Sequence, residues 1–515
     1  MYLLLKAFSV KNLRSMWTCI YHSLQVSLIT FGLLAAAGQI HAATYYVDNL
    51  AGSDRNNGNS TGSPWKLCPG MTGFAGTYTH APGDIFVFRG GVVWSNSVFP
   101  LLVNLGGGSA GNNDVYTSYT NWFIGSSWSR PVFDLQDLPI AGSTSAGTSS
   151  CIFVMDNNVT VSDIEIRNQY IPNSANWNAY GVAGVSGFQK TTNLLVQNCY
   201  IHDWLPGIPT NNVNYSDSDF GGIFSQGVNL LVIQCVVGPG DAPRGLTGNS
   251  GCSVSGSATI IQSNVFVGCT DFIDAWATNI SDNIICNGTN SYDPQNHANA
   301  IYHGLGSGGR AYIYGNIIHD LGTDFQTMLL HPGGGGATNT AYYIYNNVIW
   351  NVSSPIDIDQ SGIATTNSAT YAYIYNNTVT CGVGAVNRGQ TNYVTEIACE
   401  NNNWISDGPL NPFMTAAITT AYAPVVTRVD IDNLTMTSSL AAANGYTFGN
   451  MYAPTSLSSP TVGVGTNLTS LAILNTDIHG IRRPTTGNWD VGAYQMTTSA
   501  LLPPQNFLAS PAPNP

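Results

Sequence analysis

Aspartate and histidine side chains recur in short strand-like segments between residues 221 and 362, and both residue types can move protons or bind metal ions. The segments read GGIFSQG (Gly221–Gly227), DFIDAW (Asp271–Trp276), NAIYHGLG (Asn299–Gly306), TMLLHPGG (Thr327–Gly334) and PIDIDQSG (Pro355–Gly362). Aligning them on Ile223, Ile273, Ile301, Leu329 and Ile356 predicts stacked strands of one sheet. The ionisable residues in or beside them are Asp271, Asp274, His297, His303, His331, Asp357 and Asp359. This strip is the first candidate for a functional site.

Three chemistries fit the strip. Asp357 and Asp359 are paired carboxylates of the kind that act as acid and base in glycoside hydrolysis. Asp271, Asp274 and Asp357 are candidate calcium ligands, and a calcium ion would neutralise a sugar acid. His303 or His331 could transfer a proton near neutral pH. The competing interpretation is structural, because Asp and His at strand ends often bond to local backbone.

The alignment places His303 and His331 at one position in neighbouring strands. We therefore expect Asp274, His303, His331 and Asp357 to converge on one outward face as catalytic residues, with neighbours within about 5 Å. A lyase would instead need a strong base, and Arg244 and Arg310 are the only candidates because the region contains no lysine. Neither arginine lies in a recognisable motif, so lyase chemistry is not favoured over hydrolysis.

Two tyrosine columns are expected beside the strip, and a glycan could contact them. Tyr314, Tyr345 and Tyr375 share one repeat position and, with Arg310, are the candidate substrate-binding residues. A second column contains Tyr312, Tyr343 and Tyr373. Aromatic faces stack on sugars, but they also stack on each other across strands and stabilise a sheet. The pairs His202-Asp203 and His319-Asp320 recur with the repeat, which favours a structural role for both.

The segments that position these residues come from an internal repeat of about 30 residues. Phrases such as AYIYGNIIHDLG (Ala311–Gly322) and AYYIYNNVIW (Ala341–Trp350) align so that one slot holds Cys199, Cys235, Asn264, Asn283, Asn316, Asn347 and Asn377. A period in this range predicts a solenoid. Each unit is a short β-branched or aromatic run, and only three glutamates and four lysines occur in the chain, which disfavours exposed helices.

The slot predicts a ladder of asparagines along a parallel β-helix. Asn tolerates a left-handed bend between strands. Its amide can also bond to the same residue in the next coil, about 4.8 Å away. We therefore expect Asn316, Asn347 and Asn377 to be buried and bonded to one another.

The first 43 residues have the composition of a signal peptide. Lys6, Lys11 and Arg14 precede an apolar stretch at 26–37, and small residues follow at Ala42 and Ala43. Twelve apolar residues are too few to span a bilayer, so we expect cleavage after Ala42 or Ala43 and no transmembrane segment in the mature chain. The localisation expected is secreted, extracellular or at the cell surface.

Charge limits the partners. The formal net charge is −13, and removing three basic leader residues makes it −13 − 3 = −16. Such a surface disfavours nucleic acid and weakens the case for a polyanionic glycan.

Nine cysteines would remain after cleavage. Cys199 and Cys235 lie in the ladder slot, where they are expected as small buried groups, although neighbouring coils also bring them within disulfide range.

Several segments resemble secreted bacterial right-handed parallel β-helix proteins of the pectate-lyase-like class. They are TYYVDNLAGSDRNNGNSTGSPW (Thr44–Trp65), PGDIFVFRGGVVW (Pro82–Trp94), RPVFD (Arg130–Asp134), VTVSDIEIRN (Val159–Asn168) and DIHGIRRPTTGNWDVGAYQ (Asp477–Gln495). The resemblance covers nearly all of 44–495 and implies the fold and export. It implies little about chemistry, because the family includes lyases, hydrolases, epimerases and proteins without known activity. Family endings usually have Glu where this chain has Gln495, so Gln495 receives no catalytic role.

The domain organisation expected is a signal peptide (1–43), an N-terminal cap with the first coils (44–150), an all-β parallel helix (151–427), C-terminal coils with a cap (428–495) and a Pro-rich tail or linker (496–515). The leading functional interpretation is binding or cleavage of polysaccharide on the Asp/His strip, with calcium as a candidate ligand. The alternative is a non-catalytic surface or adhesion protein in which the helix is a rigid scaffold. A groove with converging Asp, His or Arg groups would distinguish the two.

Overall fold

The computed structural model describes most of the chain from His41 to Thr497. The described ranges are 41–141, 149–171, 183–188, 190–206, 221–239, 252–269, 271–288, 298–305, 309–322, 325–332, 339–358, 369–381, 386–388, 394–408 and 427–497. Ala43 begins the compact unit that contains all the described strands. His297 and Asp359, two residues of the predicted strip, lie outside the described ranges.

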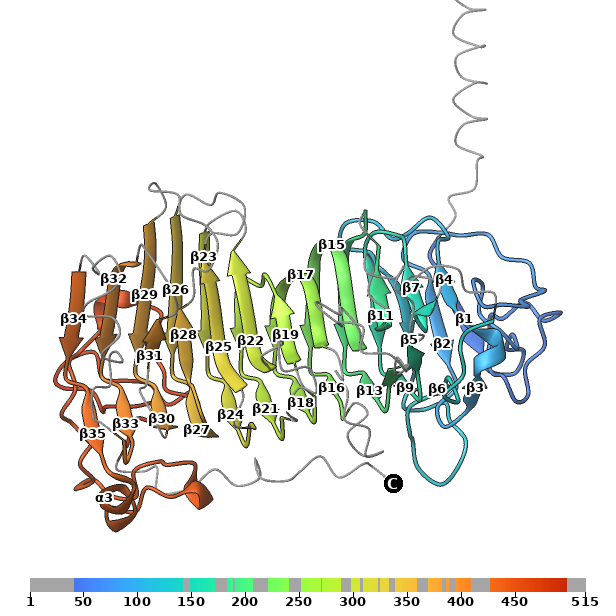
Figure 1. The fold of residues 1–515 in the computed structure, drawn as a ribbon. Coiled ribbons are helices and arrows are strands. Elements are labelled where there is room, and N and C mark those ends of the chain that lie inside the picture. Colours follow the sequence, from blue (N-terminus) through green and yellow to red (C-terminus); the bar gives the residue numbers. More distant parts are fainter. Residues whose placement is uncertain are drawn as a thin grey trace, which may run out of the picture. The chain divides into compact units, whose positions relative to one another are not determined.

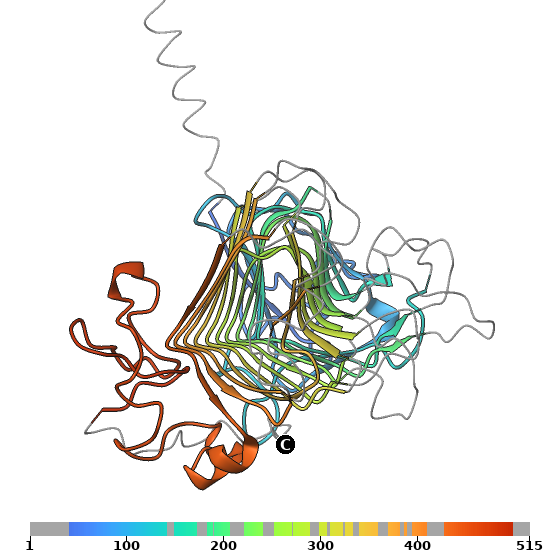
Figure 2. The same ribbon diagram turned by 60° about the vertical axis from the view of Figure 1, so that its left-hand side comes forward.

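The strands stack into a coil with three faces, and the stacked pairs are parallel (Figures 1 and 2). Faces 1 and 2 share one sheet because two long strands, β15 (Gly221–Ile233) and β17 (Cys252–Gln262), run through the corner between them. The other strands of face 1 are β4 (Leu101–Val103), β7 (Ile152–Val154), β11 (Ala183–Gly187), β19 (Asp271–Ala275), β22 (Ala298–Leu305), β25 (Phe325–Pro332), β28 (Ile356–Ile358) and β31 (Val386–Arg388).

Face 2 follows face 1 in each coil. Its other strands are β1 (Thr44–Val47), β2 (Ile85–Phe88), β5 (Asp114–Thr117), β8 (Val159–Ser162), β12 (Thr192–Gln197), β20 (Asn279–Ser281), β23 (Gly309–Tyr314), β26 (Asn339–Tyr345), β29 (Ala369–Tyr375), β32 (Val394–Glu400) and β34 (Thr427–Ile431).

Face 3 completes each coil and is a separate 12-stranded sheet. It contains β3 (Val93–Ser95), β6 (Val132–Asp134), β9 (Glu165–Arg167), β13 (Tyr200–His202), β16 (Val236–Val237), β18 (Val265–Val267), β21 (Ile284–Cys286), β24 (Ile317–His319), β27 (Val348–Val352), β30 (Thr378–Cys381), β33 (Asn403–Ile405) and β35 (Leu434–Met436). A small parallel pair, β10 (Tyr170–Ile171) and β14 (Leu205–Pro206), lies outside the three faces.

Helical structure is scarce in the described ranges. It comprises α3 (Ser438–Ala443) and the 3-10 turns η1 (Asn96–Val98), η4 (Phe448–Asn450) and η5 (Thr469–Leu471). None of these helices is long and apolar enough to pass through a bilayer. The parallel pairing of strands on all three faces confirms the parallel β-helix expected from the sequence.

The asparagine ladder is confirmed at the corner between faces 2 and 3, and it is longer than the sequence predicted. The side-chain amide of Asn316 donates to Asn347 Oδ1 at 2.9 Å, and that of Asn347 donates to Asn377 Oδ1 at 3.0 Å. The ladder runs without a break from Asn264 through Asn283 and on to Asn402 and Asn433. Each amide also donates to a main-chain carbonyl, so the buried side chains are fully used.

The expected left-handed bend is one residue away from the predicted position. The residue before each ladder position has positive φ, as in Asp282 (58°), Asn346 (55°) and Asn376 (49°). The ladder residues themselves do not. The slot is therefore reserved for the amide bonds between coils, while Asn, Asp, Ser or Gly in the preceding position makes the turn.

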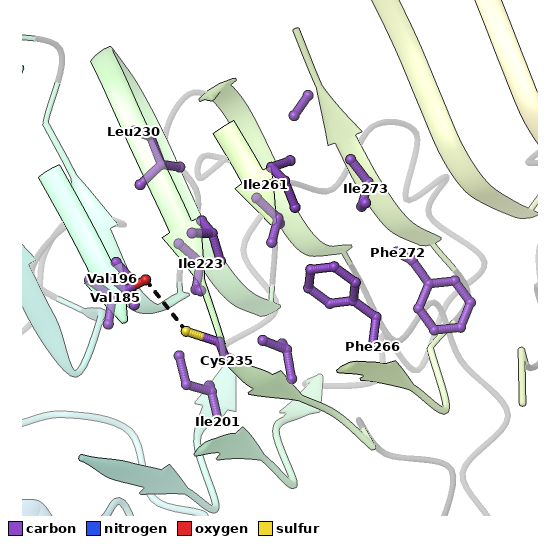
Figure 3. Packing of buried hydrophobic residues seen from close by; sticks show 14 of the residues in the cluster. Val185, Val196, Ile201, Ile223, Leu230, Cys235, Ile261, Phe266, Phe272 and Ile273 are labelled. Carbon is purple, nitrogen blue, oxygen red and sulfur yellow. Dashed lines mark hydrogen bonds between the residues drawn. The ribbon is translucent and has the colours of Figure 1, made fainter. Parts of the chain in front are cut away.

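Apolar side chains from all three faces fill the interior (Figure 3). Ile223 and Ile273 point inward from face 1, Leu230 and Ile261 from face 2, and Phe266 from face 3, all 1% exposed or less. Cys235 lies among them, and its thiol donates to the Val196 carbonyl. Cys199 and Cys235 are both free thiols, so the disulfide considered from the sequence is not formed.

The segment from Asp477 to Gln495 closes over the outside of the ladder corner near the last coils (Figure 2). Arg483 is 2% exposed and donates to Asn346 Oδ1 at 3.0 Å and to the Gly492 carbonyl at 3.1 Å. Burial lowers the pKa of Arg483 to about 10. The resemblance noted for this segment thus corresponds to a packed structural element.

Candidate functional site

The outer side of face 1 carries the site that the structure supports best. Alternation in the strands identifies it, because Ile273 and Ala275 are fully buried in the interior while Asp274 between them is partly exposed. The same test places Tyr302 outside, between the buried Ile301 and His303. Register confirms the arrangement, since Asp274 pairs with Tyr302 on the next coil. Two polar side chains therefore stand side by side on this surface.

The column continues through the next coils with chemically different residues. Tyr302 pairs with Leu329, Leu329 with Asp357, and Asp357 with Asn387. Asp357 lies between two interior isoleucines but is only 6% exposed, and it accepts a hydrogen bond from Ser354 Oγ at 2.7 Å. Asp274 is therefore partly exposed, whereas Asp357 is enclosed.

His303 does not belong to this outer surface, so the expectation that it faces outward is wrong. It is fully buried, its Nε2 lies 2.6 Å from the Ala277 carbonyl, and its ring makes an edge contact with Tyr342 of face 2. Burial lowers the pKa of His303 to about 4. The imidazole is thus neutral and donates from Nε2, which makes it part of the core.

The expected adjacency of His303 and His331 is also wrong, because the register differs by one residue. His303 pairs with Leu330, and His331 pairs with Gly304. A shift of one residue exchanges inside for outside in a strand. The side chains of His331 and Asp359 lie outside the described part of the structure, so their proposed catalytic roles stay predictions.

The two carboxylates of the column are too far apart for the chemistries that require a pair. Three strand steps separate Asp274 from Asp357, which is about 14 Å at about 4.8 Å per step. Glycosidases hold their two carboxyl groups about 5–9.5 Å apart. Asp274 and Asp357 therefore do not converge and do not form a hydrolytic pair. The pair Asp357 and Asp359 expected from the sequence stays a prediction, because Asp359 lies outside the described ranges.

The same spacing removes the proposed calcium site. Asp271, Asp274 and Asp357 cannot share one ion across this distance, and no group of three acidic, histidine or cysteine side chains in the described ranges is arranged to hold a metal. Asp271 instead accepts hydrogen bonds from the backbone and side-chain amides of Asn299 at 2.9 and 3.2 Å. Burial raises the pKa of Asp271 to about 6.

Trp276 is the residue of this surface that the sequence interpretation missed. It directly follows β19, two residues after Asp274, and 57% of its surface is exposed. The described aromatic rings make no stacking contact with it. The phrase DFIDAW contained the signal, because Ala275 separates Asp274 from Trp276 and a strand-like alternation would put both on the outside.

The tyrosine columns are confirmed as columns, but they do not offer free ring faces. Tyr312, Tyr343 and Tyr373 stack on one another with centroids 5.0 and 4.9 Å apart. Tyr314 and Tyr345 stack at 4.8 Å, nearly parallel. Stacked rings cover each other's faces, so this geometry supports the cross-strand structural role.

Two of the predicted substrate-binding tyrosines are also inaccessible. Tyr345 and Tyr375 are 6% and 4% exposed because Leu468, Leu474 and Trp489 pack over them. A substrate-binding role for these two is therefore wrong in this structure.

The other two candidates of that group, Tyr314 and Arg310, remain accessible. Tyr314 is half-buried. Arg310 is exposed at the start of β23, and its hydrogen bond with Tyr312 raises the pKa of Arg310. Their proposed role in substrate binding stays a prediction.

A second group of ionisable residues lies on the outer side of face 3. Arg167 bridges Asp134 and Glu165 at 3.0 and 3.1 Å. His202 contacts Glu165 at 3.4 Å and Asp203 at 2.8 Å. Each member thus has a charged partner within the group, which supports the structural role expected for His202-Asp203. His319 pairs with Asp320 in the same way, at 2.7 Å.

Comparisons with known proteins assign no family to this chain. No protein-family model matches the chain, and no curated protein matches it. Among solved structures, the pectate lyase Pel9A is similar over 89% of this chain and 98% of its own, with 14% identity and a TM-score of 0.47. The GH136 lacto-N-biosidase from Eubacterium ramulus is similar over 83% of this chain and 72% of its own, with 12% identity and a TM-score of 0.36. Similarities this distant assign neither a substrate nor site residues to this chain.

Proposed function

We propose that this protein binds a neutral polysaccharide along the outer side of face 1. The observation that carries the proposal is the exposed indole of Trp276, two residues after Asp274, together with the pairing of Asp274 with Tyr302 on the next coil. An accessible aromatic face stacks on the apolar face of a sugar ring. A carboxylate and a phenol accept and donate hydrogen bonds to sugar hydroxyls.

Charge favours a neutral glycan over an acidic one. The chain carries a formal net charge of −13, and the site itself contributes a carboxylate rather than a cation. A polyanion would be repelled by both. The same argument disfavours nucleic acid. We also propose that the protein acts outside the cell, as the composition of the first 43 residues indicates.

Binding is proposed ahead of cleavage because Asp274 and Asp357, the carboxylates that the described strands place in this column, are three strand steps apart. Cleavage would need a further group such as His331 or Asp359. A screen of neutral and acidic glycans for new reducing ends and for unsaturated products tests this alternative directly. Product formation that is lost in His331→Ala or Asp359→Asn would show that the site is catalytic.

The binding proposal is tested by the single change Trp276→Ala on a glycan identified by the screen. Removing the stacking face should weaken the affinity about tenfold or more, equivalent to about 1.4 kcal/mol. The thermal midpoint should stay nearly unchanged, because an exposed side chain contributes little to folding. Asp274→Asn should weaken binding by a smaller factor.

Phe448→Ala is the matched control. Phe448 is an aromatic residue of η4 that is 59% exposed, close to the exposure of Trp276, and it belongs to the C-terminal segment. Its removal should leave glycan affinity unchanged. Full affinity in both Trp276→Ala and Asp274→Asn would contradict the proposal and favour the rigid-scaffold alternative.

A further inference from the structure

The buried carboxylate of Asp84 accepts a hydrogen bond from the backbone N–H of Ala43. The Ala43 nitrogen lies 2.7 Å from Asp84 Oδ1, and Asp84 is completely buried. Ala43 immediately precedes β1, the first strand of face 2, and Asp84 immediately precedes β2, which pairs with β1. The contact therefore joins the beginnings of two paired strands at the start of the coil.

Asp84 has hydrogen-bond donors but lacks a countercharge among the described residues. Its Oδ2 accepts the Tyr78 hydroxyl at 2.7 Å and the Ala81 N–H at 2.9 Å. None of the ion pairs formed within the described ranges includes Asp84. The neighbouring Asp114, in contrast, pairs with His80 at 2.8 Å. A buried carboxylate without a countercharge is costly, so the Asp84 site is suited to a cation.

Ala43 is held on its other side as well. Its carbonyl accepts the Ile85 N–H at 2.8 Å, a backbone hydrogen bond between the first two coils. Cleavage after Ala43 would remove this acceptor together with the contact to Asp84. Cleavage after Ala42 would keep both and change only the nitrogen, from a neutral amide to a charged amine.

We propose that Asp84 is the binding site for the α-ammonium group of Ala43, created when a peptidase hydrolyses the Ala42–Ala43 bond. Water adds to the Ala42 carbonyl carbon and the C–N bond breaks. The Ala42 carbon retains the oxygen of water as a carboxylate, and the Ala43 nitrogen leaves with the protons as an ammonium. An amide–carboxylate hydrogen bond thereby becomes an ion pair with stronger, charge-assisted hydrogen bonding. Processing at this bond would fasten the first strand to the coil.

The test compares free and blocked N-termini on the mature chain, Ala43–Pro515. One form begins with the free amine of Ala43, and the other carries an N-terminal acetyl group. Acetylation should lower the thermal midpoint by about 2 °C or more at pH 7. In Asp84→Asn the same acetylation should have little effect, because the charge it removes no longer has a partner.

Asp114→Asn is the matched control, since it removes the neighbouring buried carboxylate but leaves Asp84 in place. It should retain the full effect of acetylation. An equal effect of acetylation in wild type and Asp84→Asn would overturn the proposal. So would a mature N-terminus at Thr44, determined by sequencing the exported protein.

A pH series keeps the proposal testable if Asp84→Asn does not fold. The α-amino group has an ordinary pKa of about 7.7–8.0, and pairing with Asp84 raises the folded value. The stabilisation by the free amine should therefore be complete below about pH 7.7 and be lost as pH rises through the raised folded pKa. The other titratable groups facing the site are Tyr45, Tyr78, Asp114 and His80, and they are common to both forms. A difference between the free and acetylated forms that does not change with pH would contradict the proposal.

Discussion

The asparagine ladder and the outer column of face 1 are built by the same coils but use side chains in opposite ways. From Asn264 to Asn433 the ladder repeats one residue, with each amide bonded to the next, and its members from Asn264 to Asn402 are buried. The face 1 column changes from Asp274 to Tyr302 to Leu329 to Asp357, with exposure that varies from coil to coil. Identity along a column indicates a bond between coils, whereas variation leaves side chains available for a ligand. The experiments below test this distinction.

The largest effect is expected from breaking the ladder with Asn347→Leu. Asn347 donates to Asn377 Oδ1 and the Ile313 carbonyl, and it accepts from both nitrogens of Asn316. The change leaves these buried partners unsatisfied, so we expect a loss of about 3–5 kcal/mol in the free energy of unfolding. Chemical denaturation measures it.

The same substitution at an exposed asparagine is the control for the ladder. Asn59→Leu should change stability by less than about 0.5 kcal/mol. A stability of Asn347→Leu close to that of Asn59→Leu would show that identity along the column does not indicate bonding between coils.

The next largest effect is the pH dependence of stability caused by His303, which is buried in the core and is not part of the outer column of face 1. The pKa of His303 falls from an unfolded value of 6.5 to about 4 in the folded chain, because burial disfavours its charged form. The folded state then binds fewer protons than the unfolded state between these values. Stability is therefore full above pH 6.5 and is lost as pH falls towards 4, by about 3 kcal/mol.

His303→Gln removes this titration and keeps a donor for the Ala277 carbonyl. Urea unfolding at several pH values between 7 and 4 should show a shallower acid decline in the variant than in the wild type. Parallel pH profiles would mean that His303 is accessible and protonated, and would restore it to the outer surface. Glycan affinity should be unaffected by the change.

Asn347 and His303 show which features could be predicted from the sequence and which could not. The ladder was predictable because Asn recurs at one position of neighbouring repeats and its amide can bond to the same residue in the next coil. The position of His303 was not, because segments of different length separate each ladder residue from the following face 1 strand. Asn283 precedes His303 by 20 residues and Asn316 precedes His331 by 15. Counting from the ladder therefore cannot fix which residues of that strand face outward.

Contacts between distant segments were also invisible. Nothing near Tyr345 or Tyr375 in the sequence indicates that Leu468 and Trp489 cover them. Trp276 had a local signal, namely its alternation with Asp274, but its exposure depends on what the rest of the chain leaves uncovered.

A smaller effect should separate the tyrosine column from the proposed binding surface. Tyr343 stacks between Tyr312 and Tyr373, so Tyr343→Ala removes two cross-strand contacts. We expect a stability loss of about 1–2 kcal/mol and no change in glycan affinity. Trp276→Ala should give the opposite pattern. Loss of binding in Tyr343→Ala without loss of stability would move the glycan site to face 2.

The smallest effect is expected at His202, whose titration has the opposite sign to that of His303. Burial lowers the pKa of His202, but hydrogen bonds to Asp203 and Glu165 outweigh burial, and the net pKa is raised. A group with a raised folded pKa adds stability below its unfolded value of about 6.5, and this stability is lost as pH rises through the folded pKa. Asp203→Asn removes the larger favourable contact, so its stability relative to the wild type should be lower at pH 5.5 than at pH 8. Titration of the His202 ring by NMR should show a lower pKa in the variant. Because the face 3 group is internally paired, glycan affinity should be the same in both proteins. Weaker binding in Asp203→Asn, with an unchanged His202 pKa, would identify the face 3 group as a ligand site and would reverse the assignment of structural and functional surfaces.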